Sequence, residues 1–197
     1  MLSPKPPPLV MTLPDWVHGT VRDWTEPLTN DLERMKLAVE LSRRNVERGG
    51  GPFAALVFAG EACLGAGVNR VVSSGFSIAH AEILALMAAQ QSAHEPSTSV
   101  IPALTLVTTT EPCCQCFGAL IWAGVSRLVC GATTEEAEAI GFDEGPKPPD
   151  WPRVLEQRGI TVLREIRRQE AAAVLRAYQA SGGEIYGKSS RQRGVTK

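Results

Sequence analysis

Two short runs of metal-ligating residue types, far apart in the chain, constrain its fold more than any other feature. The first run is His80-Ala81-Glu82, and the second is Pro112-Cys113-Cys114-Gln115-Cys116. One imidazole and two thiolates make three ligands of a tetrahedral zinc, and an open fourth position is typical of catalytic rather than structural sites. The fold must therefore bring His80 beside Cys113 and Cys116, with Glu82 as the carboxylate that a metal-bound water requires nearby.

Other interpretations of the same runs stay open. The spacing C-x-x-C also occurs in redox pairs and in structural zinc sites. A redox pair would leave His80 and Glu82 without a role, and a structural site would require a fourth ligand, for which Cys114 is the candidate. On a helix, however, Cys114 would point away from the face that Cys113 and Cys116 share. The catalytic metal site is therefore the favoured interpretation.

The geometry of a regular helix adds a condition to this interpretation. Residues two apart on a helix diverge by about 200°. His80 and Glu82 can therefore flank one metal ion only if the pocket lies across the start of their helix.

Composition restricts the class of protein. The chain has 197 residues, of which 44% are hydrophobic and 21% charged, and its net charge is -1. A single globular domain fits these values, and the absence of a basic excess disfavours a large nucleic-acid partner. No apolar run approaches the ~18 residues that a membrane helix requires. Because the proline-rich start of the chain lacks the apolar core of a secretory signal, we expect a cytoplasmic protein.

Five cysteines, an odd number, argue against a disulfide framework. Cys63 and Cys130 lie in apolar runs with strand character, and we expect both to be core residues.

Strand and helix patterns alternate along the chain, which predicts an α/β sheet covered on both faces. The helix expected at 31–48 begins at Asn30, with Glu33 placed to complete a capping box. A second capping box is expected at Thr133 and Glu136, and Pro112 suits the first turn of the helix that carries the cysteines. The predicted strands are 53–59, 62–68, 104–109, 127–132 and 160–164; the predicted helices are 31–48, 79–94, 113–123, 133–141, 152–158 and 169–181.

The domain organisation that we expect is a proline-rich arm at 1–27, one folded domain at 28–187 and a basic tail at 188–197. The arm carries Trp16 and Trp24 without clear periodicity, so no helix is expected there. The apolar stripe of the first predicted helix, by which it would face the core, is Leu32, Met35, Val39 and Val46.

Four segments together resemble the cytidine/deoxycytidylate deaminase superfamily, whose signature pairs H-x-E with a later P-C-x-x-C. Two more, Ala139-Ile140-Gly141-Phe142-Asp143-Glu144 and Glu184-Ile185-Tyr186, resemble the bacterial-type guanine deaminases. The resemblance implies a three-layer α/β/α sandwich around a mixed five-stranded sheet. The four superfamily segments are Gly51-Pro52-Phe53-Ala54-Ala55, Gly67-Val68-Asn69, the His80 run and residues 109–116.

The implied activity is zinc-dependent hydrolysis of guanine to xanthine and ammonia, with metal-bound hydroxide as the nucleophile and Glu82 as the proton shuttle. The resemblance further implies a second proton carrier at Asp143 or Glu144, of which we prefer Glu144, the last acid of its run. The other implied roles are zinc ligation by His80, Cys113 and Cys116, hydrogen bonding of the purine by Asn69, pocket walls from Phe53 and Trp122, and closure of the site by Tyr186.

Partners follow from the same resemblance. It implies a homodimer whose C-terminal segment crosses to the neighbouring subunit, with guanine and aminated triazines as small-molecule substrates. The chain departs from the family pattern at Ala54, at Cys114 and Gln115, and at three prolines after Glu144. A tRNA adenosine deaminase, a cytosine deaminase and an inactive zinc-stabilised scaffold are the rival interpretations.

Overall fold

A computed structural model of the chain describes residues 10–92 and 103–186, and these residues build one mixed five-stranded sheet with the strand order β2-β1-β3-β4-β5. β1 pairs antiparallel with β2 and β3, whereas β3, β4 and β5 run parallel. The predicted mixed sheet is therefore confirmed. The strands are β1 (Ala54–Ala59), β2 (Ala62–Val68), β3 (Leu104–Thr110), β4 (Val125–Ala132) and β5 (Thr161–Leu163).

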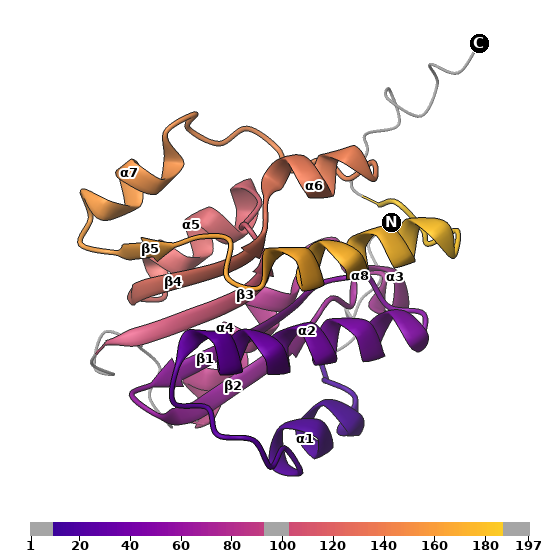
Figure 1. Ribbon diagram of the computed structural model, residues 1–197, viewed down its shortest axis with the longest axis horizontal. Helices are drawn as coiled ribbons and strands as arrows, with labels where there is room; N and C mark the ends of the chain where they lie inside the picture. Colours follow the sequence, from indigo (N-terminus) through magenta and orange to yellow (C-terminus); the bar gives the residue numbers. More distant parts are fainter. Residues whose placement is uncertain (1–9, 93–102, 187–197) are drawn as a thin grey trace, which may run out of the picture.

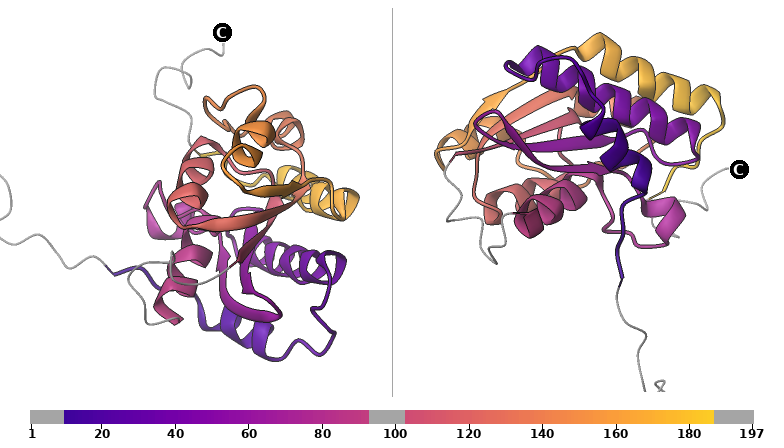
Figure 2. Two further views of the ribbon diagram at one scale, coloured as in Figure 1. Left: turned by 90° about the vertical axis from the view of Figure 1, so that its left-hand side faces the viewer. Right: turned by 90° about the horizontal axis from the view of Figure 1, so that it is seen from below.

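Helices cover both faces of this sheet (Figure 1). Figure 2 shows α2 and α8 in one layer and α4 and α5 in the opposite layer, with the strands between them. This arrangement is the α/β/α sandwich that the resemblance implied. The helices are α1 (Asp15–Arg22), α2 (Asp31–Glu47), α3 (Val71–Ser74), α4 (Ala81–Ser92), α5 (Cys114–Trp122), α6 (Thr134–Ala139), α7 (Trp151–Glu156) and α8 (Arg168–Ala180).

The side chains of β1 alternate between two apolar cores, as the two-residue period of a strand requires. Ala55 and Val57 belong to the core beneath α4 and α5. Leu56 and Phe58 belong to the core beneath α2. Both faces of β1 are therefore buried, which explains why its sequence is continuously apolar rather than alternating.

Two glycines of β2 allow α4 to lie unusually close to the sheet. A Cβ atom on Gly67 would lie 2.2 Å from the Ala81 carbonyl oxygen, and one on Gly65 would lie 2.4 Å from the Ala85 carbonyl oxygen. No side chain fits between the strand and the helix at these positions. This close approach fixes the start of α4, where His80 and Glu82 lie.

The structure corrects several details of the predicted elements. Helices α1 and α3 were not expected, and α1 contributes the fully buried Val17 to the core beneath α2. Leu32 is 54% exposed and does not belong to the buried face of α2. That face is instead formed by Arg34, Met35, Leu37, Ala38, Leu41, Ser42 and Asn45.

The helix starts also differ in part from the prediction. Asn30 caps α2 through the Glu33 N–H, but the Glu33 carboxylate accepts from the backbone N–H and hydroxyl of Thr29. The predicted cap at Thr133 is present, with its N–H donating to Glu136 over 2.8 Å. Pro112 precedes the capping residue of α5 instead of lying in its first turn.

The predictions for two cysteines and for the two ends of the chain have different outcomes. Cys130 is fully buried, as predicted, but Cys63 on the edge strand β2 is only half-buried. The basic tail at 188–197 and the first nine residues of the arm lie outside the described residues. None of the helices among the described residues combines the length and the apolar character needed to cross a membrane.

Candidate metal and active site

The three predicted metal ligands converge at the starts of two helices. His80 directly precedes α4, and its carbonyl accepts the N–H of Leu84 over 3.1 Å. Cys113 is the capping residue of α5, and its carbonyl accepts the N–H of Phe117. Helix N-termini carry partial positive charge and favour anionic sulfur. The fold therefore places both cysteines where thiolates are stabilised.

The spacing of these ligand atoms fits zinc. The His80 Nδ1 atom lies 3.4 Å from Cys113 Sγ and 3.6 Å from Cys116 Sγ. The three ligand atoms all lie within 4.8 Å of one another. Tetrahedral zinc, with Zn–S about 2.3 Å and Zn–N about 2.0 Å, requires N···S separations of about 3.5 Å. The residues present therefore suit a zinc ion with three protein ligands.

The two ligand thiols are electrostatically inequivalent without the metal. The hydrogen bond from Cys116, helped by contact with His80, outweighs the opposing effect of burial and lowers the pKa of Cys113 to about 4. The same hydrogen bond, together with burial, raises the pKa of Cys116 well above its ordinary value. In the metal-free pair one sulfur is thus a thiolate at neutral pH and the other keeps its proton, which zinc binding would displace.

Glu82 reaches the same site from the first turn of α4. Its side chain is buried, and its carboxyl group hydrogen-bonds the Cys116 side chain. Burial, followed by the nearby charge of Cys113, raises the pKa of Glu82. The site lies across the N-terminal end of α4, which is the condition that the helical geometry imposed on His80 and Glu82.

A cavity opens beside the ligand triad, and its far wall is aromatic. The ring centroids of Phe53 and Phe142 are 4.9 Å apart, and those of Phe142 and Tyr186 are 5.0 Å apart. Asn69, Glu82 and Glu144 bring polar groups to the same space. The lining residues are Phe53, Asn69, His80, Glu82, Thr110, Glu111, Cys113, Phe142, Asp143, Glu144 and Tyr186.

Asn69 presents donors to this cavity. Its Oδ1 atom accepts the backbone N–H of Val71 over 3.2 Å, and this donor fixes which way round the amide lies. The buried Nδ2 group then has no hydrogen-bond partner among the described residues, and neither does the Tyr186 hydroxyl. Buried polar groups are normally paired, so these two point to a polar ligand.

The two neighbouring acids of the 143–144 pair have different surroundings. The Asp143 side chain is exposed and accepts the N–H of Gly145 over 2.9 Å, which closes a tight turn. Glu144 is only 6% exposed, and burial, followed by the charge of Cys113, raises its pKa to about 8. Asp143 is thus exposed, whereas Glu144 is buried beside the triad and is protonated at neutral pH in the metal-free site.

Other predicted site residues differ in their placement. Phe53 lies in the cavity wall. Tyr186 lines the cavity of its own chain, packed against Phe142. Trp122 does not line this cavity, and its side chain is 89% exposed. The implied wall role of Trp122 is therefore not met within one chain.

Sequence reasoning missed three residues that shape the site. Asn45, buried on α2, donates to the carbonyls of Gly51 and Asn69 over 2.8 and 2.9 Å and so holds both segments together. Phe142 lies at the centre of the aromatic wall, and Glu111 anchors the strand end before Cys113. A buried-face asparagine just before Gly49-Gly50-Gly51 was the one available signal, since α2 otherwise buries mostly apolar groups.

Comparisons with known proteins find one family model and several similar proteins. A family model described as the cytidine and deoxycytidylate deaminase zinc-binding region matches residues 28–132. A solved structure of guanine deaminase from Nitrosomonas europaea is 45% identical, with a TM-score of 0.82 over 88% of this chain and 97% of its own. A structure solved with 2,6-diaminopurine is 46% identical, with a TM-score of 0.83 over 90% of this chain and 96% of its own.

The tRNA-specific adenosine deaminase of Buchnera aphidicola is also similar. It is 31% identical over 144 residues, which cover 72% of this chain and 88% of its own.

Proposed function

The chain belongs to the cytidine and deoxycytidylate deaminase zinc-binding family, and we propose that it hydrolyses guanine to xanthine and ammonia. One observation carries this proposal: a cavity beside a zinc-type triad combines an aromatic wall with two buried polar groups that lack partners among the described residues. A flat, polar heteroaromatic base is the kind of ligand that such a cavity fits.

Four of the lining residues then have a task in binding. The Asn69 Nδ2 group donates to acceptor atoms on the edge of the purine, and the Tyr186 hydroxyl lies where it can pair with another. Phe53 and Phe142 enclose the ring on its apolar side. The structures of relatives with bound 2,6-diaminopurine and 8-azaguanine support a purine ligand.

Proton transfer is assigned to the two buried carboxyl groups. Zinc held by His80, Cys113 and Cys116 would supply a water that deprotonates at about neutral pH. Glu82 takes the proton from the attacking water and delivers it to the ring, since a carboxylate of raised pKa suits transfer in both directions. Glu144, buried beside the triad, protonates the departing amine, which leaves as ammonia, and takes back the remaining proton from the new hydroxyl group as the carbonyl forms.

Ammonia release should be measured with guanine, adenine, adenosine, cytosine, cytidine and an aminated triazine, alongside metal analysis of the same sample. We expect turnover of guanine by the zinc-loaded protein. Glu82→Gln should keep its zinc and its folded structure, with kcat reduced by about 10³-fold or more. Turnover of a pyrimidine with none of guanine would contradict the proposal.

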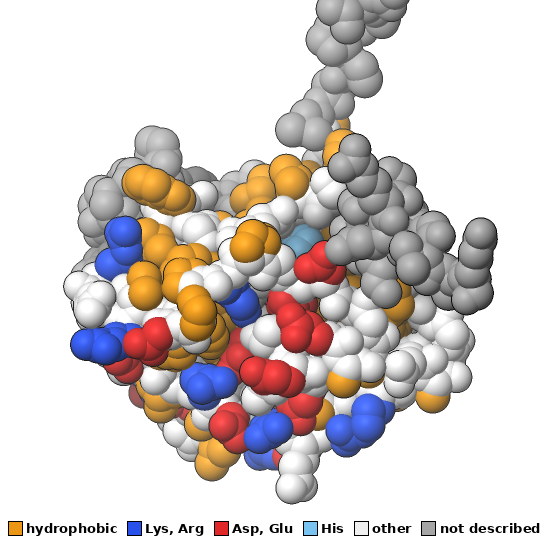
Figure 3. Space-filling model, turned by 90° about the horizontal axis from the view of Figure 1, so that it is seen from above, with side chains coloured by type: hydrophobic (Ala, Val, Ile, Leu, Met, Phe, Trp, Pro, Cys, Tyr) orange, Lys and Arg blue, Asp and Glu red, His pale blue; other side chains and the backbone are white. Residues whose placement is uncertain are grey.

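Adenosine deamination in tRNA is the second candidate, favoured by the similarity to the Buchnera protein. A tRNA substrate requires phosphate contacts from a basic surface. Acidic side chains gather near the middle of the face shown in Figure 3, with lysine and arginine residues around them, and the net charge of the chain is -1. These charges favour a small substrate over a polyanion.

A homodimer is part of the proposal. Large apolar side chains are exposed on α4, on α5 and just before α4: Ile78 is 59%, Met87 50% and Trp122 89% exposed. A second copy of the chain would bury them. Sedimentation should give a dimer that Trp122→Glu shifts to monomer. Exchange of the C-terminal segment and a cytoplasmic location both stay predictions.

A further inference from the structure

The segment after Glu144 is the part of the site that the proposed chemistry leaves unexplained. It joins α6 to α7 without regular secondary structure, and three of its residues, Pro146, Pro148 and Pro149, are prolines. Prolines lack a backbone N–H, so this segment has few main-chain donors with which to fasten itself. Contacts from neighbouring elements, including side chains, must therefore help to fix the segment that carries Glu144.

Contacts with α5 hold one side of this segment. The Cys114 N–H donates to the Glu144 carbonyl over 2.9 Å. A Cβ atom on Gly145 would lie 2.4 Å from Cys114 Sγ, so the segment touches the first turn of α5 directly. Glu144 is thus tied to the residue that follows the metal ligand Cys113.

Lys147 holds the other side. Its Nζ atom donates to the Pro112 carbonyl over 2.7 Å and to the Thr134 hydroxyl over 2.8 Å. The ammonium group also lies 5.4 Å from the centre of the Trp151 ring. One side chain therefore joins the Glu144 segment, the strand end before Cys113 and the start of α6.

The partners of Lys147 are themselves anchored. The Thr134 hydroxyl and N–H both donate to Glu111, over 2.9 and 3.0 Å, and Arg164 pairs with the other oxygen of that carboxylate. Because Glu111 and Pro112 are adjacent in the chain, the contacts close into a ring. Lys147 is the member of this ring that belongs to the Glu144 segment.

We propose that Lys147 is a positioning residue that fixes the Glu144 carboxyl group relative to the metal ligands. This inference rests on the proposed function of Glu144 as a proton carrier. Lys147 does not touch the substrate; it acts through the backbone on both sides of the cavity. A displacement of about 1 Å at a catalytic group can lower the rate by about 100-fold.

Lys147→Met tests the proposal, because methionine keeps the packing on Trp151 and removes the donor. We expect kcat for guanine, per bound zinc, to fall by about 10-fold to 100-fold, with KM changed by less than about threefold. Lys147→Arg should recover most of the lost kcat. The matched control is Lys36→Met, which removes an exposed lysine paired with Glu26 and should leave both constants unchanged.

Amide hydrogen exchange of the zinc-loaded protein gives a readout that does not depend on the substrate. The N–H groups of Cys114 and Gly145 should exchange faster in Lys147→Met and normally in Lys36→Met. Wild-type kcat per zinc in Lys147→Met, or unchanged exchange at both amides, would overturn the positioning role. A wild-type protein inert toward guanine would contradict the proposed function alone, since the exchange measurement would still test whether Lys147 fixes the Glu144 segment.

Discussion

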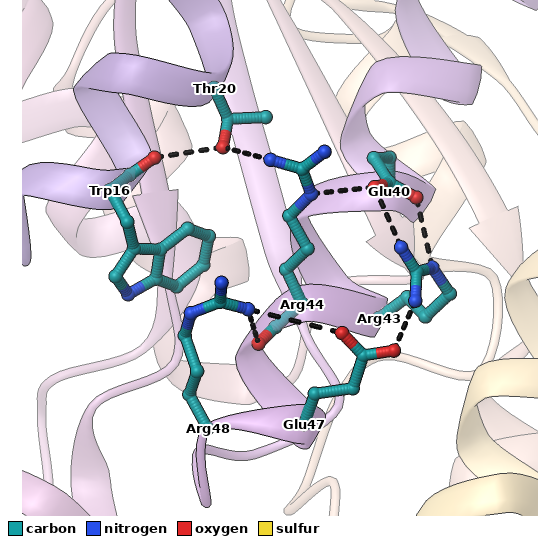
Figure 4. A network of polar contacts seen from close by, with 7 residues as sticks. All are labelled: Trp16, Thr20, Glu40, Arg43, Arg44, Glu47 and Arg48. Carbon is teal, nitrogen blue, oxygen red and sulfur yellow. Dashed lines mark hydrogen bonds and ion pairs between the residues drawn. The ribbon is translucent and has the colours of Figure 1, made fainter.

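Two charge clusters, one behind the metal site and one between α1 and α2, are built from the same types of side chain. In the outer cluster, Arg44 joins the Glu40 carboxylate to the Thr20 hydroxyl, and Arg48 lies over the Trp16 ring (Figure 4). In the inner cluster, Arg164 pairs with Glu111, which the Thr134 hydroxyl also contacts. Arg164 and Lys147 both lie over the ring of Trp151.

The clusters differ mainly in how deeply the carboxylate is buried. Arg164 and Arg44 are almost equally exposed, at 40% and 38% of their side-chain surface. Their carboxylate partners are not, because the Glu111 side chain is 1% exposed and the Glu40 side chain 21%. The same pairing therefore carries different consequences: water can replace Arg44 around Glu40, but it cannot readily reach Glu111.

The largest expected difference comes from removing the two arginines. Arg164→Met should lower the free energy of unfolding by about 3 to 5 kcal/mol, because it leaves a buried charge without its ion-pair partner. Arg44→Met should cost less than about 1 kcal/mol. Urea unfolding of the zinc-loaded proteins at one pH gives both values. Equal losses would show that the burial of the carboxylate does not govern the outcome.

The next largest expected difference is in the pH dependence of stability, which should differ between Glu144 beside the metal site and Glu40 in the outer cluster. Burial raises the pKa of Glu144 to about 8, so the folded state keeps a proton that the unfolded chain loses near its ordinary pKa of 4.5. This group therefore stabilises the fold most at low pH, and that contribution is lost as the pH rises from about 4.5 through about 8. In the outer cluster, the hydrogen bond from Arg43 lowers the pKa of Glu40. Its contribution is present above pH 4.5 and is lost as the pH falls through the lowered pKa.

Zinc-free protein is the sample for this measurement, since the metal would add its own charge to the site. Between about pH 5 and about pH 9, wild type should lose about 4 kcal/mol of stability relative to Glu144→Gln. Glu40→Gln should run parallel to wild type over that range and diverge only in more acidic solution. A constant difference between wild type and Glu144→Gln across the range would contradict the raised pKa.

The strength of the local sequence signal decides which parts of the molecule could be predicted. The metal triad was predictable because spacing and residue type alone identify ligands, and the strands because β1 and β3 are dense in apolar and β-branched residues. Helix α1 was missed because it is only eight residues long and contains Gly19, although its buried residues Val17 and Thr20 lie three apart on one face. Its stability comes from packing on β2 and α2 rather than from local propensity.

One site assignment, the choice between Asp143 and Glu144, needed the fold. Asp143 and Glu144 are adjacent acids in an irregular segment, where no period distinguishes an inward from an outward side chain; the contact of Cys114 with the Glu144 carbonyl decides it. Trp122 is the opposite case. It lies six residues after Cys116, about 240° around the helix, so the helical period already pointed it away from the metal.

The smallest expected effect on the free energy of unfolding is the difference between alanine substitutions at two glycines of similar backbone conformation. Gly145 and Gly49 have φ angles of +68° and +77°, in the region that other residues adopt only with strain. Around Gly49 nothing lies within 4 Å of an added Cβ atom, whereas at Gly145 the Cys114 sulfur would lie 2.4 Å away. Gly49→Ala should therefore cost about 1 kcal/mol from the backbone alone, and Gly145→Ala about 2 kcal/mol because overpacking adds to it.

A double-mutant cycle isolates the overpacking cost of Gly145→Ala from its backbone cost. Cys114→Ala removes the sulfur that the new methyl group would meet, so Gly145→Ala in that background should cost only the backbone share, about 1 kcal/mol. Because Cys114 also donates its N–H to the Glu144 carbonyl, which alanine preserves, the segment should keep its position in the cycle. If the cost at Gly145 is the same with and without the sulfur, the Gly145 backbone is not packed against the Cys114 side chain, and the Cys114 N–H bond to the Glu144 carbonyl would be the contact that still joins this segment to α5.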